Sequence, residues 1–436
     1  EEVRDHDYLL HLHTKKSLYS GSEKSSWRDH LLTSLLPSAP AVDAILSLLA
    51  DDPTVGVVQA PVWEGVPTWG NHWLGNGPVG ADLYERLGVE DRSAHGYLMY
   101  PVGGMFWAKV DALQPLLDLR LTVGHFDREH GQTDRTLAHA IERTIPAAAA
   151  TRGFDTVEFD YTAAQWRRNW SEALLFQDEF TDIAGLRAAL QSADLVSVDL
   201  FDTLVLRPTL DPASLFEVLS LQFDAEVKTP EDRARTSSAQ LACGHDLVRF
   251  RRESEDQLRR SGEIAGDVTL DEIYTNARSQ HAAVANQLDR LKQLELDLER
   301  RVAIPRTWLI EELLNDRIRS RQRNGPPRRY ILMTDTTQPL NAIEDLLHQI
   351  GAGELFDDLY VSNACRARKD SGSMWELVRT LETPEAARWL HLGDNEFSDI
   401  QQAADRGLAW FHIPAPGSAA QVKGVDTSLL APGVRI

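Results

Sequence analysis

The sequence predicts an α/β protein built from more than one domain, and three observations lead to this prediction. The 436-residue chain is longer than one ordinary hydrophobic core accommodates, so it should divide into two or three domains. In the C-terminal half, short apolar runs end in polar or acidic residues and alternate with helical patterns, which is typical of a parallel sheet. The long segment between the first two runs has helical spacing and few strand signals, which indicates a helical insert.

The predicted strands of the C-terminal half are five apolar runs that we interpret as buried parallel strands. They cover residues 195–198, 330–333, 359–361, 389–392 and 408–413. The predicted core domain comprises residues 191–208 and 326–420, and a helical cap at 209–325 interrupts it. Within that cap, apolar residues recur at helical intervals: Val284, Leu288, Leu291, Leu298 and Val302. Residues 421–436 are expected to form a C-terminal tail.

The first 150 residues differ in character and are rich in Trp, His and Gly. Strand-like pieces lie at 8–12, 55–58 and 104–108, and helical ones at 31–50 and 136–143, so we predict a second α/β domain over residues 1–150. Residues 151–190 are expected to form a linker and a docking helix. The chain begins with Glu rather than Met, and we expect this N-terminal domain to be incomplete at its start.

Composition excludes several classes of function. The net charge of −21 argues against a nucleic-acid partner, because phosphate neutralisation needs clustered Lys and Arg. No apolar segment approaches the roughly 20 residues of a membrane-spanning helix. The two cysteines, Cys243 and Cys365, cannot build a disulfide framework or a four-cysteine zinc site. We therefore expect a cytoplasmic protein.

Residues suited to phosphoryl transfer follow four of the predicted strands. In an open α/β sheet, catalytic groups gather at the carboxyl ends of strands. Asp199 follows the first strand, Thr334 follows the second, Lys369 lies beyond the third, and the fourth is followed by two acids, Asp394 and Asp399. A carboxylate can attack phosphorus as a covalent nucleophile, a lysine offsets crowded anionic oxygens, and carboxylate oxygens suit Mg²⁺.

In their order and spacing, these residues resemble the motifs of the haloacid dehalogenase (HAD) superfamily over roughly residues 192–415. The resemblance rests on segments 198–204, 368–372 and 391–400 together with Thr334. It implies a Rossmann-like HAD core with a cap, a nucleophilic Asp199, a hydrogen bond from Thr334 to the transferred group, and a charge-balancing Lys369. It also implies a magnesium site, to which we assign Asp199, Phe201, Asp394 and Asp399.

One departure from that pattern concerns the general acid. HAD phosphatases usually carry a second Asp two residues after the nucleophile, and Phe201 occupies this position. Asp202 is one residue further on. Two hypotheses stay open: Asp202 takes over the acid role, or the domain binds a phosphorylated ligand with little turnover.

Three of the residues that match the HAD motifs also have a plain structural explanation. Thr334 would serve equally as the N-cap of the next helix. Lys369 would serve as a solvated loop cation, and Asp399 as a helix cap or ion-pair partner. The four motifs together, in the right order at strand ends, favour the functional interpretation.

The N-terminal domain carries a second set of polar residues. Segments 7–17, 103–109 and 126–143 resemble the rhamnan synthesis protein F family of glycosyltransferase-like proteins. The resemblance covers roughly residues 5–150 and implies sugar transfer from a nucleotide donor. In that chemistry Glu129 or Asp134 would be the base, and three cations would face the diphosphate, namely Lys15, Lys16 and Arg143. An ordinary helix-stabilising pair of side chains would equally explain Arg143.

The two resemblances together predict a bifunctional enzyme of cell-surface polysaccharide biosynthesis. Its HAD domain would be a Mg²⁺-dependent phosphohydrolase or phosphotransferase that forms an aspartyl-phosphate. Its expected partners are a phosphorylated small molecule or a nucleotide-sugar with a glycan acceptor, and peripheral association with polysaccharide assembly proteins is compatible with this. The alternative is a non-catalytic scaffold that binds phosphorylated sugars or partner glycosyltransferases.

Overall fold

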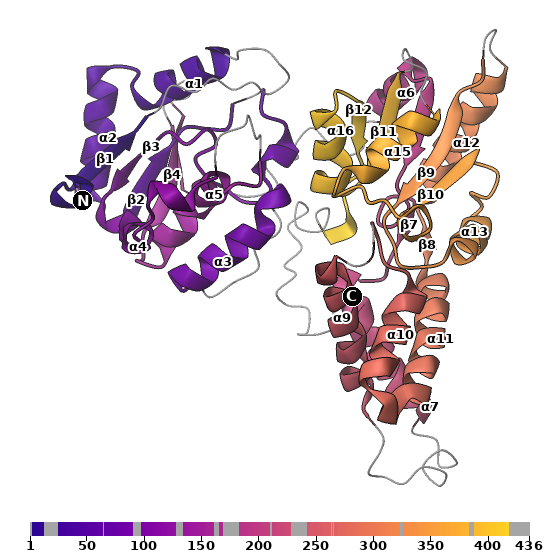
Figure 1. The fold of residues 1–436 in the computed structure, drawn as a ribbon. Helices are drawn as coiled ribbons and strands as arrows, with labels where there is room; N and C mark the ends of the chain where they lie inside the picture. The colour runs from indigo at the N-terminus through magenta and orange to yellow at the C-terminus, as the bar shows by residue number, and fades with distance from the viewer. Residues whose placement is uncertain are drawn as a thin grey trace. The chain divides into compact units, whose positions relative to one another are not determined.

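The computed structural model divides into two compact units, Glu1–Gln177 and Asp178–Ile436. It describes residues 2–12, 25–63, 65–89, 97–127, 134–160, 165–168, 183–209, 212–227, 242–262, 264, 266–322, 326–382 and 388–417. The C-terminal tail expected at 421–436 lies outside these ranges. Figure 1 shows both units as ribbons.

The first unit is built on a mixed five-stranded sheet in the order β1-β3-β2-β4-β5. The strands are β1 (Tyr8–His11), β2 (Val55–Gln59), β3 (Phe106–Lys109), β4 (Asp155–Asp160) and β5 (Gln165–Arg167). Only the β2–β4 pair among them is parallel. The α-helices of the unit are α1 (Ser25–Leu35), α2 (Ala39–Asp51), α3 (Gly77–Leu87), α4 (Gln114–Asp118) and α5 (Leu137–Ala150).

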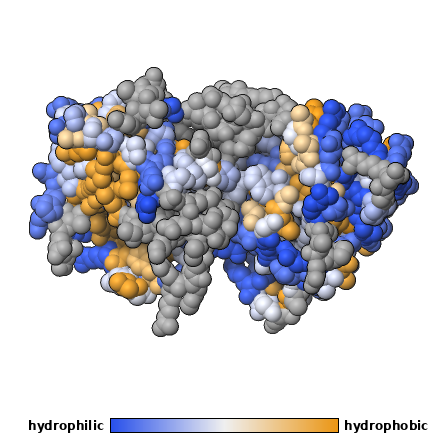
Figure 2. Space-filling model, turned by 90° about the horizontal axis from the view of Figure 1, so that it is seen from above, coloured by the Kyte–Doolittle hydropathy of each residue, from blue (hydrophilic) through white to orange (hydrophobic). Residues whose placement is uncertain are grey.

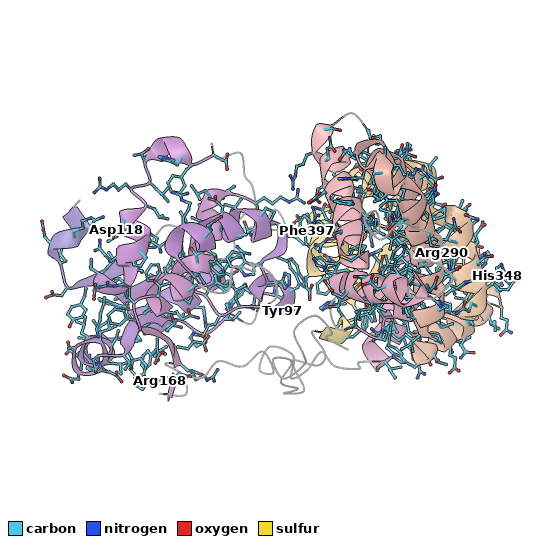
Figure 3. All side chains as sticks on the ribbon, turned by 90° about the horizontal axis from the view of Figure 1, so that it is seen from below. Tyr97, Asp118, Arg168, Arg290, His348 and Phe397 are labelled. Carbon is cyan, nitrogen blue, oxygen red and sulfur yellow. The ribbon has the colours of Figure 1, made fainter. Side chains whose placement is uncertain are left out.

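The boundary of this unit differs from the one expected at residue 150. Two of its strands, β4 and β5, come from the segment expected to be a linker, because β4 pairs with β2 and β5 pairs with β4 to complete the sheet. Arg168, labelled in Figure 3, continues this attachment by forming ion pairs with Asp52 and Asp155 and donating a hydrogen bond to Thr54 Oγ1 at 2.8 Å. The helix expected in the same segment is α6 (Ile183–Ser192), and it belongs to the second unit.

The second unit contains a five-stranded sheet in the order β10-β9-β6-β11-β12, and all neighbouring strands are parallel. Its strands are β6 (Leu195–Val198), β9 (Arg329–Thr334), β10 (Asp358–Val361), β11 (Trp389–Gly393) and β12 (Ala409–His412). The helices of this core are α6, α12 (Thr307–Arg321), α13 (Leu340–Gln349), α14 (Ser362–Cys365), α15 (Ser373–Glu382) and α16 (Gln402–Asp405). Apolar side chains cover both faces of β6, which explains its continuous hydrophobic run. The predicted fold class is therefore confirmed.

The helical cap consists of α7 (Leu215–Val227), α9 (Gly244–Ser261), α10 (Leu270–Gln280) and α11 (Ala285–Val302). These four helices lie side by side as one bundle in Figure 1 and share an apolar core that includes Phe223, Leu247 and Leu291. The chain enters and leaves the cap through a short antiparallel pair, β7 (Val205–Leu206) and β8 (Ile304–Pro305). The cap therefore ends before α12, earlier than the expected residue 325, because α12 packs its apolar side into the core of the sheet.

Polar contacts also attach the cap to the core beyond its two connecting strands. Buried Asp267, between α9 and α10, accepts a hydrogen bond of 2.5 Å from Ser362 Oγ. Glu272 at the start of α10 pairs with Arg366 at 2.8 Å. Ser362 and Arg366 flank α14, the helix that precedes the Lys369 loop. The cap is thereby fixed next to one of the loops expected to carry catalytic residues.

Hydrophilic residues cover most of the face of the second unit seen in Figure 2, and hydrophobic ones gather there only in small groups. Among the residues that the structure describes, no single helix is long and apolar enough to cross a membrane. One pair of helices, Ser26–Leu35 with Ala39–Asp51, meets the criterion jointly, and it is bent by 63°.

Candidate active site

The topology of the second sheet brings two predicted acids together. β6 lies at the centre, with β9 on one side and β11 on the other, so the order of the strands reverses there. Ligands bind outside the carboxyl ends of parallel strands at such a point. Asp199 directly follows β6 and Asp394 directly follows β11, while Thr334 is the last residue of β9. Three of the predicted motifs therefore meet at one edge because of strand pairing.

Lys369 is the centre of the polar contacts at this edge. Its ammonium group donates to Asp199 Oδ1 at 2.6 Å and to Asp399 Oδ1 at 2.5 Å. All three side chains are buried, and the lysine residue is only 2% exposed. A solvated loop cation is therefore the wrong description of Lys369, because a buried ammonium needs such partners to offset its desolvation.

The segment after β11 presents Asp399 to the same point. It forms a π-helical turn, Glu396–Gln401, and such turns occur frequently at functional sites. Gly393 allows the close approach, because a Cβ atom there would lie 2.4 Å from Cγ of Asp399. The backbone N–H of Asn395 donates to Asp399 Oδ2 at 3.0 Å. Both carboxylate oxygens of Asp399 thus accept hydrogen bonds from protein groups.

Burial and mutual repulsion separate the proton affinities of the three acids. Burial raises the pKa of Asp199 to about 7, although Lys369 opposes that rise. The pKa of Asp394 is raised further above its usual range by burial and by the neighbouring Asp199 and Asp399. The pKa of Asp399 is lowered despite its burial, because Lys369 and His391 stabilise its charge. Asp399 is therefore the acid of the three that loses its proton most readily.

The acids fit a divalent cation. One carboxylate oxygen from each of Asp199, Asp394 and Asp399 can lie within 4.8 Å of the other two. Three carboxylates against one lysine leave two negative charges when all are ionised, which a divalent ion would balance. Carboxylate oxygens are the ligands that Mg²⁺ prefers. The fourth assigned residue, Phe201, has no ligand atom in its side chain, so only its backbone carbonyl could serve.

The loop after the nucleophile places Asp202 against a cap residue. Asp202 has a positive φ of 59°, and its N–H donates to the carbonyl of Val205 at 2.7 Å. Its carboxylate accepts a hydrogen bond of 2.8 Å from Arg207, whose guanidinium also lies 4.4 Å over the centre of the Phe201 ring. The same arginine pairs with Glu299 of α11 at 3.4 Å. Burial raises the pKa of Asp202, and Arg207 opposes this.

Two further residues shape this part of the site. Thr203 donates from its hydroxyl to Asp394 Oδ1 at 3.1 Å, which links the nucleophile loop to the acidic motif. Arg306, just after β8, donates to the carbonyls of Asp202 and Thr203, both at 2.8 Å. Arg306, next to the strand through which the chain leaves the cap, therefore stabilises the turn after Asp199.

Thr334 and its neighbour Asp335 occupy the end of β9. Thr334 is buried where predicted, and its proposed contact with a transferred group stays a prediction. Asp335 was not predicted, yet it accepts hydrogen bonds from the backbone N–H of Lys369 at 3.0 and 3.1 Å. Burial raises its pKa to about 6. An acid directly after a strand-end Thr was a signal that the sequence offered.

The N-terminal candidates are only partly within the described residues. Glu129, Lys15 and Lys16 lie outside them. Asp134 and Arg143 are both buried and form an ion pair of 3.7 Å. Arg143 also donates to the carbonyl of His72 at 3.0 Å and to that of His139 at 3.1 Å, and it lies 5.0 Å over the centre of the Tyr100 ring.

The carboxylate of Asp134 receives hydrogen bonds from Asn76 and from the backbone N–H of Gly75. Among the described residues, Asp134 thus contacts Gly75, Asn76 and Arg143. Their contacts stabilise the packing of α5, and the roles of Asp134 as base and Arg143 as phosphate ligand remain predictions.

Two kinds of known protein are similar to this chain. Residues 1–154 match the model of the family described as rhamnan synthesis protein F, which confirms that resemblance for the first unit. The uncharacterized protein WxcX of Xanthomonas campestris pv. campestris is 37% identical over 155 residues, which cover 35% of this chain and 21% of WxcX. The matched part therefore spans about a fifth of that relative.

Solved structures similar to the chain include HAD-type hydrolases. YfnB of Bacillus subtilis, described as a HAD-hydrolase and solved with bound magnesium, is 14% identical, with a TM-score of 0.32, and the match covers 50% of this chain and 85% of YfnB. A haloacid dehalogenase-like hydrolase from Xanthomonas campestris is 15% identical, with a TM-score of 0.34 and coverage of 54% and 91%. Similarity at this level does not assign an activity to the chain.

Proposed function

We propose that the second unit is a magnesium-dependent phosphohydrolase or phosphotransferase of the HAD type that works through an aspartyl-phosphate. One observation carries the proposal: Lys369 joins Asp199 to Asp399 beside Asp394, where two central parallel strands end. A buried lysine with two carboxylates could be purely structural. The third acid argues for function, because burial beside two other carboxylates makes the charge of Asp394 unfavourable, and a bound cation would offset it.

In the first step Asp199 attacks the phosphorus atom of a phosphate ester, and the bond from phosphorus to the leaving oxygen breaks. Mg²⁺ held by the three acids would offset the repulsion between the negatively charged phosphate and the Asp199 carboxylate. Lys369 keeps Asp199 oriented and remains protonated, since the two carboxylates raise its pKa. In the second step water or another acceptor attacks the aspartyl-phosphate and regenerates Asp199.

Both steps also require a proton to move, and Asp202 is the candidate for this task. Its carboxyl is buried with a raised pKa, as a general acid requires. Its hydrogen bond to Arg207 must lengthen or shift for it to reach a leaving group. Because this hydrogen bond must first change, we expect hydrolysis to be slow. Transfer of the phosphoryl group to an acceptor other than water is compatible with the same arrangement.

The first unit supports a role in cell-surface polysaccharide synthesis through its match to rhamnan synthesis protein F. We propose that it takes part in sugar transfer within a longer protein, and that its donor is a nucleotide-sugar. A phosphorylated sugar or nucleotide is then the natural substrate class for the second unit.

The second candidate function is a non-catalytic scaffold that binds phosphorylated sugars or partner transferases. Phe201 favours it, because the position of the usual acid carries an apolar side chain packed in the core cluster. A scaffold would retain the metal site and bind phosphate without releasing it.

The test is phosphate release by the whole chain with Mg²⁺ and a panel of sugar phosphates, nucleotides and nitrophenyl phosphate. We expect turnover by the parent protein and none by Asp199→Asn, because an amide cannot form the acyl-phosphate. Asp256→Asn is the matched control, since Asp256 is an exposed acid on α9 that pairs with Arg260. Equal rates for parent and Asp199→Asn would remove the nucleophile assignment, and binding without turnover would favour the scaffold.

A further inference from the structure

A buried chain of hydrogen bonds runs behind the candidate active site, through residues to which the sequence assigned no role. Ser197 on β6 and His391 on β11 lie opposite each other in the parallel register. Both are fully buried, and the side chains next to them on that face of the sheet are apolar, including Leu195, Trp375 and Trp389. Polar groups in such a place are costly unless every one finds a partner.

The contacts form an unbroken series. Trp389 Nε1 lies 2.7 Å from Ser197 Oγ, and Ser197 Oγ lies 2.7 Å from His391 Nδ1. On the other side of the ring, His391 Nε2 lies 3.2 Å from Asp399 Oδ1. That same oxygen receives the ammonium of Lys369, which also binds Asp199.

The chemistry of the first member fixes the first bond, and the need of the buried serine proton for an acceptor sets the direction of the others. An indole N–H only donates, so Ser197 Oγ accepts from Trp389. The serine proton is then available for His391 Nδ1, which must be unprotonated to accept it. A neutral imidazole with an unprotonated Nδ1 carries its proton on Nε2, and it donates that proton to Asp399.

We infer that His391 is a positioning residue whose Nε2–H tautomer, selected by Ser197 and Trp389, holds Asp399 at the orientation that seats Lys369 against Asp199. The inference rests on the proposed function of this site. Burial lowers the pKa of His391, which agrees with a neutral ring. Trp375 supports the same arrangement: its ring meets the imidazole edge-on at 4.8 Å, and its indole N–H donates to the carbonyl of Lys369 at 3.1 Å.

Metal ligands and charged catalytic groups are commonly oriented by such partners, and removing one typically costs about 10–100-fold in metal affinity or activity. His391→Leu removes the donor to Asp399, so we expect kcat and Mg²⁺ affinity to fall within that range while KM for the phosphate substrate stays nearly constant. His391→Gln retains an N–H donor and should recover part of the loss. Ser197→Ala should reduce kcat by about 5-fold, the effect of one ordinary hydrogen bond.

The decisive measurement is nitrogen NMR of histidine-labelled protein near neutral pH, with His391 assigned by its loss in His391→Gln. We expect the Nε2–H tautomer in the parent and a loss of that preference in Ser197→Ala. Ser320→Ala is the matched control, because Ser320 is a buried serine of the same unit that accepts a hydrogen bond from the backbone of Arg328 at 2.6 Å. It should lose stability without changing the tautomer or Mg²⁺ binding.

An Nδ1–H tautomer or a charged ring in the parent would overturn the inference. So would a Ser197→Ala variant that matches Ser320→Ala in both tautomer and calorimetric Mg²⁺ affinity. These two readouts need no turnover. The tautomer and the Mg²⁺ affinity can come out as expected while neither the parent nor any variant releases phosphate. In that case the proposed function fails and the positioning of Asp399 stands.

Discussion

Replacing Lys369 by Met is the most informative single perturbation of the site. Methionine fills a similar volume but removes the only ammonium that contacts Asp199 and Asp399 within the part of the chain that the structure describes. The lysine side chain is 3% exposed and that of Asp399 is 1% exposed, so solvent cannot replace the lost charge. The variant leaves buried carboxylates without their counter-ion.

Breaking a buried ion pair in this way typically costs about 3–5 kcal/mol. For a unit of this size, about 1 kcal/mol lowers the melting temperature by roughly 2–4 °C, so the unfolding transition of the second unit should fall by about 6–20 °C. The loss should shrink on acidification, because Asp199 can then take up a proton. Mg²⁺ should also restore stability, and its affinity should stay equal or rise because a competing cation has gone. Turnover should nevertheless be lost.

The assays are thermal unfolding and Mg²⁺ calorimetry on the metal-free chain, with Lys292→Met as control. Lys292 pairs with exposed Asp271 on the surface of the cap, so its removal should cost only about 0–1 kcal/mol. Equal losses of stability in the two variants would refute the view that Lys369 balances the buried acids. A strong loss of Mg²⁺ affinity in Lys369→Met would also contradict it.

Three further predictions address the acids. Asp394→Ala should weaken Mg²⁺ binding in calorimetry far more than Asp399→Ala, because protein donors already engage both oxygens of Asp399; equal losses would mean that both ligate directly. If Asp202 is the acid, Asp202→Asn should slow substrates with poor leaving groups by about 10²–10⁴-fold and spare nitrophenyl phosphate, and Phe201→Asp should raise the slow rates. Because the pKa of Asp199 is raised to about 7, the folded metal-free protein retains a proton that the unfolded chain releases above about pH 4, so its stability should fall as pH rises through 7. Mg²⁺ must displace that proton, so its affinity should rise from about pH 6 to about pH 8 with measurable proton release, and a flat profile would contradict the raised pKa.

The central strands β6 and β11 were predictable because burial on both faces leaves a mostly apolar run in each, and Asp199 and Asp394 mark where those runs stop. The boundary at which the first unit ends was not predictable from the sequence. Strand β4 alternates polar and apolar residues, Asp155 to Asp160, and nothing local tells that it pairs with β2 from about a hundred residues earlier. Long-range pairing of this kind is a tertiary property that local patterns do not carry.

The candidate site shows the same division. Asp199, Thr334 and Asp394 could be proposed from the sequence, because each lies at the carboxyl end of a predicted strand and parallel strands bring these ends to one edge of the sheet. Arg207 and Glu299 were missed, since they meet only when the two ends of the cap come together. His391 was visible as a polar residue inside an apolar run, and so was Ser197, yet only the register of β6 against β11 shows that they bond to each other.

Hydrolysis in the proposed mechanism therefore depends on Asp202. A general acid must be free to approach the leaving group, but this carboxylate belongs to a tight turn and is bonded to Arg207, which lies just after the strand that enters the cap. Glu299, near the end of the last cap helix, shares the same guanidinium. Any movement of the cap against the core must either carry Arg207 away from Asp202 or pull on the turn that follows the nucleophile. If Asp202 is the acid, as proposed, Phe201 and Arg207 belong to one arrangement, in which Asp202 protonates a leaving group only after it separates from Arg207.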